Sequence, residues 1–290
     1  MWRRLFLSLV MLSGAVITVS AQKQRELPLP VVPDSLQLPA DRADYILLHF
    51  WDELTSGHMD DDILMEQSFV NFVSIFPHAS EVGREMSTHA LLSKLEVTPK
   101  AYRMIMGLAD KYLYELESPM LSEPFYLLFL NEFINSPLLD TTEKNRVQAV
   151  RETVMMNRPG TPATDFEFTD RNGETKTLHG LETEGNILLI FYNPDCDNCH
   201  QLISDLERNS EIEGQMNSGA LSIVAIYSGS DRKSWENTAQ ELPGKWTVGY
   251  EPDTVEEKDL YDFRAIPTIY LLDKNKTILI KDLSPTFFSE

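Results

Sequence analysis

Residues 186–200 read Asn-Ile-Leu-Leu-Ile-Phe-Tyr-Asn-Pro-Asp-Cys-Asp-Asn-Cys-His. Residues 186–192 form an apolar run of strand length with many β-branched and aromatic side chains, which predicts a central strand covered on both faces. The Asn-Pro pair that follows ends this strand. Further on, apolar residues recur at helical spacing, at Leu202, Ile203 and Leu206. The stretch therefore predicts a buried strand and a turn that delivers Cys196 and Cys199 to the start of a helix.

Cys196 is expected near the N-terminus of that helix, where unpaired N–H groups and the helix dipole favour a thiolate. Cys199 follows one helical turn further in. These are the two cysteines of the chain, so no thiol remains for a structural disulfide framework. The Cys-x-x-Cys pair is therefore predicted to carry the chemistry of the protein.

A second motif follows the first: Arg-Ala-Ile-Pro-Thr at residues 264–268 precedes an apolar strand at 269–272. A Cys-x-x-Cys pair at a strand-to-helix turn, joined downstream by Ile266-Pro267-Thr268, resembles the thioredoxin-like superfamily. The separation, 267 − 196 = 71 residues, suits its periplasmic thiol-disulfide oxidoreductase branch. Residues 161–166 and 169–173 resemble the opening hairpin of that branch, which peroxiredoxins share. The resemblance covers about residues 158–290.

This resemblance implies an α/β thioredoxin-like domain with a central mixed sheet flanked by helices. It implies that Cys196 attacks a substrate disulfide and Cys199 resolves the mixed disulfide. It further implies that Pro267 is cis and that Ile266 and Pro267 bind substrate, with the backbone of Ile266 pairing with an extended chain. The alternative is that Pro267 is an ordinary core loop proline. The expected partners are protein thiols and disulfides and an upstream envelope reductant, with no metal and no cofactor besides the redox-active disulfide.

The rest of this region alternates strands with helices. Segments at 166–170 and 175–178 flank Asn172-Gly173, a hairpin signal. Further strands are predicted at 221–227, 246–250, 269–272 and 277–280, and helices at 231–242 and 256–263. Such an alternation predicts an α/β sandwich.

The first 21 residues predict a secretory signal, removed before Gln22. Arg3 and Arg4 precede an apolar stretch at 5–19, and small residues lead to Ala21. The alternative, a membrane anchor, is disfavoured because a spanning helix needs about 20 apolar residues. We therefore expect a periplasmic protein without a membrane span once the signal is removed. The prolines of residues 22–40 then predict an extended lead-in.

Residues 41–157 predict an all-α domain. Helices are expected from Asp41 to 54, after Asp60–Asp62, from Ser80, after Thr98-Pro99, after Ser122 and from Thr141 or Thr142. His58 with the three aspartates could form a metal cluster, although helix capping explains the acids better. The domain resembles a helical domain of unknown function that precedes thioredoxin-like domains in secreted Gram-negative proteins.

The charge of the chain excludes some classes of partner. Its formal net charge is −20 over 290 residues, which argues against nucleic acid and against anionic lipid surfaces. Asp195 and Asp197 flank Cys196, and negative charges nearby disfavour a thiolate. A protonated His200 would act in the opposite direction. The two acids favour a reductase or isomerase role over that of a strong oxidant.

Other functions fit parts of the same pattern. A zinc site would need ligands such as His179 or His200 beside the cysteines, and residues 196–200 match the c-type haem attachment pattern. A peroxiredoxin would share the hairpin but would need a threonine where residues 193–195 read Asn-Pro-Asp. An adaptor or redox-sensing protein that acts through its helical domain is a non-enzymatic alternative.

Overall fold

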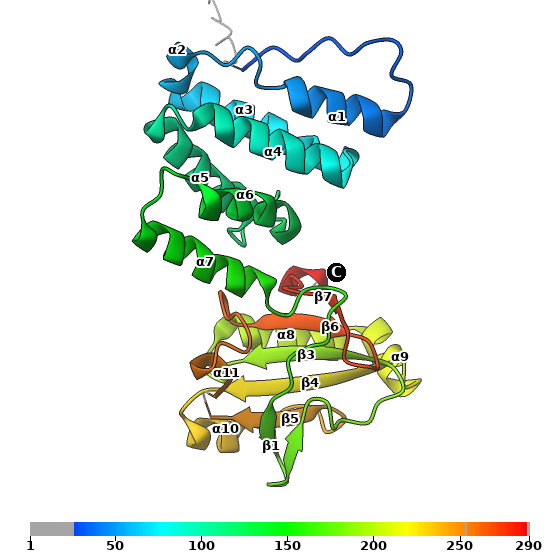
Figure 1. Cartoon of the computed structure of the whole chain (residues 1–290). Helices are drawn as coiled ribbons and strands as arrows, with labels where there is room; N and C mark the ends of the chain where they lie inside the picture. Colours follow the sequence, from blue (N-terminus) through cyan, green and yellow to red (C-terminus); the bar gives the residue numbers. More distant parts are fainter. Residues whose placement is uncertain (1–25, 253, 289–290) are drawn as a thin grey trace, which may run out of the picture. The chain divides into compact units, whose positions relative to one another are not determined.

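The computed structural model describes residues 26–252 and 254–288. The chain divides into two compact units, Met1–Ser87 and Thr88–Glu290, and Figure 1 labels their helices and strands. The second unit holds both helices and the sheet, so the boundary expected after residue 157 falls inside it and stays a prediction. The expected signal at 1–21 lies outside the described residues.

The first unit is helical. Its elements are α1 (Pro39–His49), α2 (Ser56–Met59), α3 (Asp62–Ser74), the 3-10 helix η1 (Phe76–His78) and the first part of α4 (Glu81–Leu95). Helix α1 begins two residues before Asp41, the expected cap, because Pro39 suits the first turn of a helix. The carboxylate of Asp61 accepts the Leu64 N–H at 3.2 Å and caps α3, and Asp62 lies in the first turn, as helix capping predicts.

The helical region continues into the second unit with α5 (Pro99–Leu113), α6 (Glu123–Asn135) and α7 (Thr141–Met155). Helix α5 packs against α6, and α6 against α7. Helix α7 begins at Thr141, one of the two expected starting positions. Asp140 caps it, because its carboxylate accepts the Glu143 N–H at 2.8 Å while Glu143 returns a bond to the Asp140 N–H at 2.9 Å.

The sheet has seven strands in the order β2-β1-β5-β4-β3-β6-β7. They are β1 (Glu167–Asp170), β2 (Thr175–Thr177), β3 (Asn186–Tyr192), β4 (Leu221–Ser228), β5 (Thr247–Glu251), β6 (Thr268–Leu272) and β7 (Ile278–Ile280). Strands β3, β4 and β5 are parallel, whereas β1, β6 and β7 run antiparallel to their neighbours. This mixed sheet confirms the predicted α/β class.

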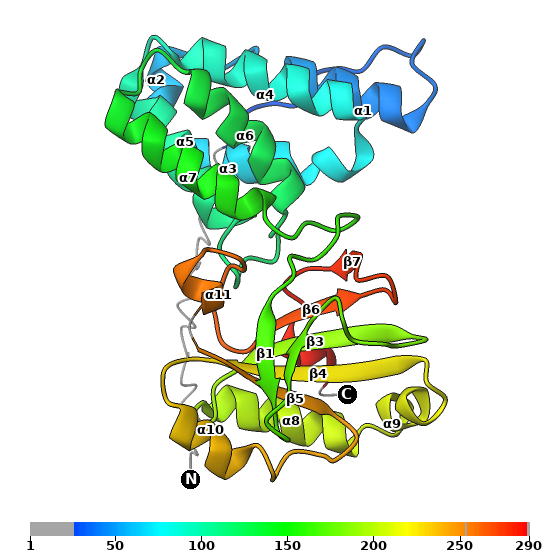
Figure 2. The same cartoon turned by 60° about the horizontal axis from the view of Figure 1, so that its bottom comes forward.

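Strand β3 is central and buried on both faces. Leu188, Ile190 and Tyr192 point to one core, which contains residues of α8 (Asp197–Arg208) and α10 (Arg232–Thr238). Alternate residues of β3 point to a second core on the other face. Figure 2 shows α8, α9 (Ser210–Asn217) and α10 on one side of the sheet. At the end of the chain, η2 (Pro285–Phe288) packs on α8.

Aromatic rings line the first core where the parallel strands end. Tyr192, Tyr227 and Tyr250 are register partners on β3, β4 and β5, with ring centroids 6.3 Å and 6.0 Å apart. The Trp235 ring of α10 lies 5.5 Å beyond Tyr250. The four rings form a continuous aromatic row.

Three predicted helices are too long, and α9 was not predicted. The helix expected at 41–54 ends at His49 and is followed by a turn. The helix expected at 231–242 ends at Thr238, because the Glu241 N–H closes a tighter turn on the Thr238 carbonyl at 2.9 Å and Pro243, which has no N–H, follows. The helix expected at 256–263 is only α11 (Thr254–Glu257). Beyond it, Asp259 takes a left-handed φ of 49°, and the Asn157 amide binds the Leu260 carbonyl at 2.7 Å.

Candidate active site

The turn between β3 and α8 presents the two thiols. Cys196 is the N-cap of α8, and its N–H donates to the Asn193 carbonyl at 3.1 Å. The Asn193 side chain accepts the Asp195 N–H at 2.8 Å, which adds a second hydrogen bond to the same turn. His200 N–H donates to the Cys196 carbonyl at 3.1 Å and starts the helix. Local hydrogen bonds therefore hold Cys196 at the helix N-terminus.

The two sulfurs differ in exposure. Cys196 is half-buried, whereas Cys199 is fully buried at 0% exposure, and both are free thiols. This is the arrangement that the sequence predicts for an attacking and a resolving cysteine. The assignment of these roles stays a prediction.

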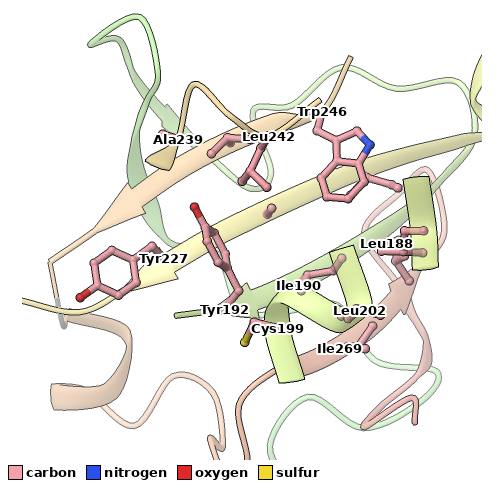
Figure 3. Packing of buried hydrophobic residues seen from close by; sticks show 14 of the residues in the cluster. Leu188, Ile190, Tyr192, Cys199, Leu202, Tyr227, Ala239, Leu242, Trp246 and Ile269 are labelled. Atoms are coloured by element: carbon pink, nitrogen blue, oxygen red, sulfur yellow. The ribbon is translucent and has the colours of Figure 1, made fainter. Parts of the chain in front are cut away.

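Cys199 lies in an apolar environment. Ile190, Tyr192 and Leu202 belong to the same core, and Figure 3 shows them around β3 and the first turns of α8. Burial raises the pKa of the Cys199 thiol well above its usual range, and the neighbouring Cys196 acts in the same direction. A hydrogen bond with the Asn193 backbone opposes this rise only in part. The reduced Cys199 therefore keeps its proton at neutral pH.

The Ile266-Pro267 loop lies beside the turn. The peptide bond between these residues is cis, as the sequence predicts. Strand β6 begins directly after it and runs antiparallel to β3, with Thr268 opposite Phe191. This pairing brings the loop to the end of β3, where Cys196 Sγ donates to the Ile266 carbonyl at 3.6 Å. Cys196 and Ile266 are thus in direct contact, and Pro267 follows Ile266 in the chain. Cys199, the fourth predicted site residue, neighbours Cys196.

Arg264, two residues before Ile266, binds several acidic groups. Its Nη2 lies 3.0 Å from the Glu123 carboxylate and also donates to Asp282. Its Nε lies 3.0 Å from the Asp262 carboxylate and forms an ion pair with it, but the geometry does not suit a hydrogen bond. The guanidinium donates to the Tyr114 carbonyl at 2.9 Å and lies 4.4 Å from the centre of that ring. We call these groups, with Lys281, the Arg264 cluster.

Lys281 completes the Arg264 cluster. Its Nζ lies 3.0 Å from the Glu123 carboxylate and donates to the Met156 carbonyl at 3.2 Å. Burial raises the pKa of Glu123 and of Asp262, and the nearby Lys281 and Arg264 oppose this rise. The cluster thus holds three carboxylates and two cations. Sequence reasoning missed it, because Glu123 and Arg264 are 141 positions apart.

The charged residues near the turn point to solvent. Asp195 and Asp197 are exposed. His200 Nε2 lies 2.6 Å from the Pro194 carbonyl, so that nitrogen carries a proton and donates it there. The described residues contain no group of three His, Cys, Asp or Glu side chains suited to a metal ion. Within the same residues, every helix is too short or too polar to cross a membrane.

Comparisons with known proteins agree with this architecture. Residues 13–157 match the family described as "Domain of unknown function (DUF5106)". The crystal structure of a thioredoxin-like protein from Bacteroides caccae is similar over 90% of this chain and 95% of that chain, with 32% identity and a TM-score of 0.82. No curated protein matches the chain.

Shorter structures match less than half of the chain. The C-terminal domain of an uncharacterized protein from Bacteroides fragilis is 36% identical over 46% of this chain and 99% of that chain, with a TM-score of 0.43. The thioredoxin domain of a thiol-disulfide oxidoreductase from Bacteroides vulgatus is 18% identical over 43% of this chain and 89% of that chain, with a TM-score of 0.39. On the family match and the Bacteroides caccae structure, this chain belongs to the thioredoxin-like proteins and carries a DUF5106 domain.

Proposed function

We propose that this protein is an exported, periplasmic thiol-disulfide oxidoreductase that exchanges disulfides with protein substrates and acts mainly as a reductase or isomerase. The observation that carries the proposal is the position of Cys196. Its half-buried sulfur lies at a helix N-terminus and 3.6 Å from the Ile266 carbonyl, with the buried Cys199 one turn behind it. Membership in the thioredoxin-like proteins supports the same chemistry.

The reaction has two exchanges. The Cys196 thiolate attacks one sulfur of the substrate disulfide, the substrate S–S bond breaks, and the departing sulfur takes up a proton. Cys199 then loses its proton and attacks the Cys196 sulfur of the mixed disulfide. This step forms the Cys196–Cys199 disulfide and releases the second substrate thiol. Two electrons pass from the pair to the substrate, and an upstream envelope reductant restores the dithiol.

The loop before β6 serves substrate binding in this proposal. Pro267 has no N–H, and Ile266 offers backbone groups next to Cys196. An extended substrate chain can pair with those groups as an added strand. Such pairing places a substrate disulfide beside Cys196 without requiring a particular substrate sequence.

The surroundings of the thiols favour a low reduction potential. A strong oxidant stabilises its reduced form. Here burial disfavours negative charge on Cys199, and the carboxylates of Asp195 and Asp197 flank Cys196 in the chain. We therefore expect a potential nearer about −270 mV than about −120 mV. A value above about −150 mV in equilibrium with glutathione would contradict the charge argument.

A trapping experiment tests the proposal. The Cys199→Ser variant lacks the resolving thiol, so a protein substrate stays linked to Cys196 by a disulfide. The linked complex migrates as one band on a non-reducing gel, and reductant separates it into its two proteins. The Cys196→Ser variant is the matched control and should trap nothing. Equal trapping by the two variants, or none by either, would refute the assigned chemistry.

A further inference from the structure

A pocket opens beside the active-site turn on the face covered by α8 and α10. Its volume is about 190 Å³. Its walls include Tyr192 at the end of β3, His200, Ile203 and Glu207 on α8, and Glu241 and Leu242 after α10. This volume is below the roughly 300–1,000 Å³ of a typical small-molecule site. The pocket is therefore sized for one side chain of a larger partner.

The Tyr192 hydroxyl lies at the wall of this pocket without a hydrogen-bond partner. Tyr192 is 3% exposed, and its oxygen has no partner among the described residues. The Trp235 indole N–H lies close enough to influence the pKa of this phenol. Neither the indole N–H nor the hydroxyl, however, forms a hydrogen bond of normal geometry. Figure 3 shows the hydroxyl directed away from Cys199 toward Leu242, a lining residue. A buried hydroxyl usually has a partner, so a bound group that donates to it would satisfy it.

The negative charge at the pocket favours a positively charged ligand group. Glu207 and Glu241 are exposed carboxylates on two different segments of its wall. The described lining residues include no Lys or Arg. Arg171, a cation near Tyr192, is bound by the carbonyls of residues 242, 243 and 246. The pocket thus offers negative charge at its rim and a hydroxyl acceptor deeper in.

We infer that this pocket binds a lysine or arginine side chain of the substrate polypeptide, next to the disulfide that Cys196 attacks. The aliphatic stem of such a side chain would pack on Ile203 and Leu242, and long basic side chains commonly cover apolar surface in this way. Its cation would lie between Glu207 and Glu241, and an N–H could donate to the buried Tyr192 oxygen once a small shift of the lining side chains uncovers it.

The position of the pocket supports a polypeptide ligand. Two of its lining residues, Pro194 and His200, flank Cys196 in the turn. A chain that pairs with the Ile266 backbone advances about 3.3 Å per residue, so a side chain a few positions from the substrate cysteine can reach toward the pocket. The inference rests on the proposed function, because it assigns substrate specificity to the same site.

The test compares pairs of synthetic peptides, each closed by one disulfide. One member of each pair has Lys and the other has Gln at a single position. The pairs together cover about three positions on each side of the reacting cysteine. The second-order rate constant for reduction by the dithiol protein is measured by stopped-flow fluorescence. The readout is the ratio of the Lys to the Gln rate constant within each protein, so a general change in reactivity cancels.

We expect a ratio of about threefold to tenfold at one position at low ionic strength, as two partly exposed ion pairs would give. It should fall toward one at about 0.5 M salt because the charges are screened. A double variant, Glu207→Gln with Glu241→Gln, should lose the preference. Tyr192→Phe, which removes only the hydroxyl, should reduce it.

The matched control changes net charge by the same amount elsewhere. Glu211→Gln with Glu213→Gln neutralises two carboxylates of α9, outside the pocket, and should keep the wild-type ratio. A wild-type ratio of one at every position would overturn the inference and leave the proposed function standing. A preference lost equally in both double variants would also overturn it, because overall charge would then be the cause. If no peptide is reduced at all, both proposals fail.

Discussion

Replacing Arg264 with methionine tests whether the Arg264 cluster holds the active-site loop in place. The substitution keeps an unbranched apolar stem and removes the guanidinium. It leaves the carboxylates of Glu123, Asp262 and Asp282 with Lys281 as the remaining cation of the cluster. It also removes the contact with the Tyr114 ring and carbonyl.

The size of the effect follows from the burial of these groups. Removing one partner of a buried ion pair costs about 3–5 kcal/mol, because the other charge is left uncompensated. Arg264 keeps 15% side-chain exposure, and Lys281 still offsets part of the negative charge. We therefore expect the lower end, a loss of about 3 kcal/mol in the free energy of unfolding. For a unit of this size, that loss lowers the Tm by about 6–12 °C.

The assay is thermal unfolding of the reduced protein at several pH values. The pKa values of Glu123 and Asp262 are already raised by burial, and losing Arg264 raises them further. The native variant would then hold protons more tightly than its unfolded chain. Its stability falls as pH rises through the carboxyl range. The deficit against wild type should therefore be largest at neutral pH and smaller near pH 4.

Arg232→Met is the matched control. Its guanidinium pairs with Glu236 at 2.9 Å on the surface, where the two side chains are 57% and 53% exposed. Such a pair contributes about 1 kcal/mol or less. Equal losses in the two variants, or a deficit of Arg264→Met that does not change with pH, would refute the account of the cluster.

Four other outcomes can be measured. The reduction potential should keep falling by at least about 30 mV per pH unit up to about pH 11, because the raised pKa of Cys199 retains one proton; a potential that levels off near pH 9 would contradict this. Gly249→Ala should lower the free energy of unfolding by about 1–3 kcal/mol because a Cβ there would collide with Phe168. Gly107→Ala, with open space around it on a helix, should raise this free energy by about 1 kcal/mol in the same denaturation assay. N-terminal sequencing of protein from the native envelope should begin at Gln22, and an intact Met1 would contradict export.

Local patterns predicted the parts of the site that lie close together in sequence. The apolar run before Cys196 and the helical spacing after Cys199 specify a strand, a turn and a helix within one stretch. The Ile266-Pro267 motif could be connected with them only through resemblance to a family. The pairing of β6 with β3 shows why the motifs meet, since it joins the start of one strand to the end of the other.

Contacts between distant segments could not be read from sequence. Glu123 looked like an ordinary residue in the first turn of a helix, yet it binds Arg264 and Lys281. Arg171 likewise binds the carbonyls of Leu242, Pro243 and Trp246, about 70 positions later in the chain. Helix α9 escaped prediction because only Ile212 and Met216 of its side chains pack on the core.

The aromatic row also gives the protein an internal optical reporter. Trp235 ends the row, and Trp246 lies in the same core as Cys199. Excitation absorbed by Tyr192 and its neighbours can pass along the row to Trp235 by energy transfer. Any change in the packing of this core when the bond at Cys199 closes should therefore change the emission of these two tryptophans, so the unlabelled protein would report its own redox state.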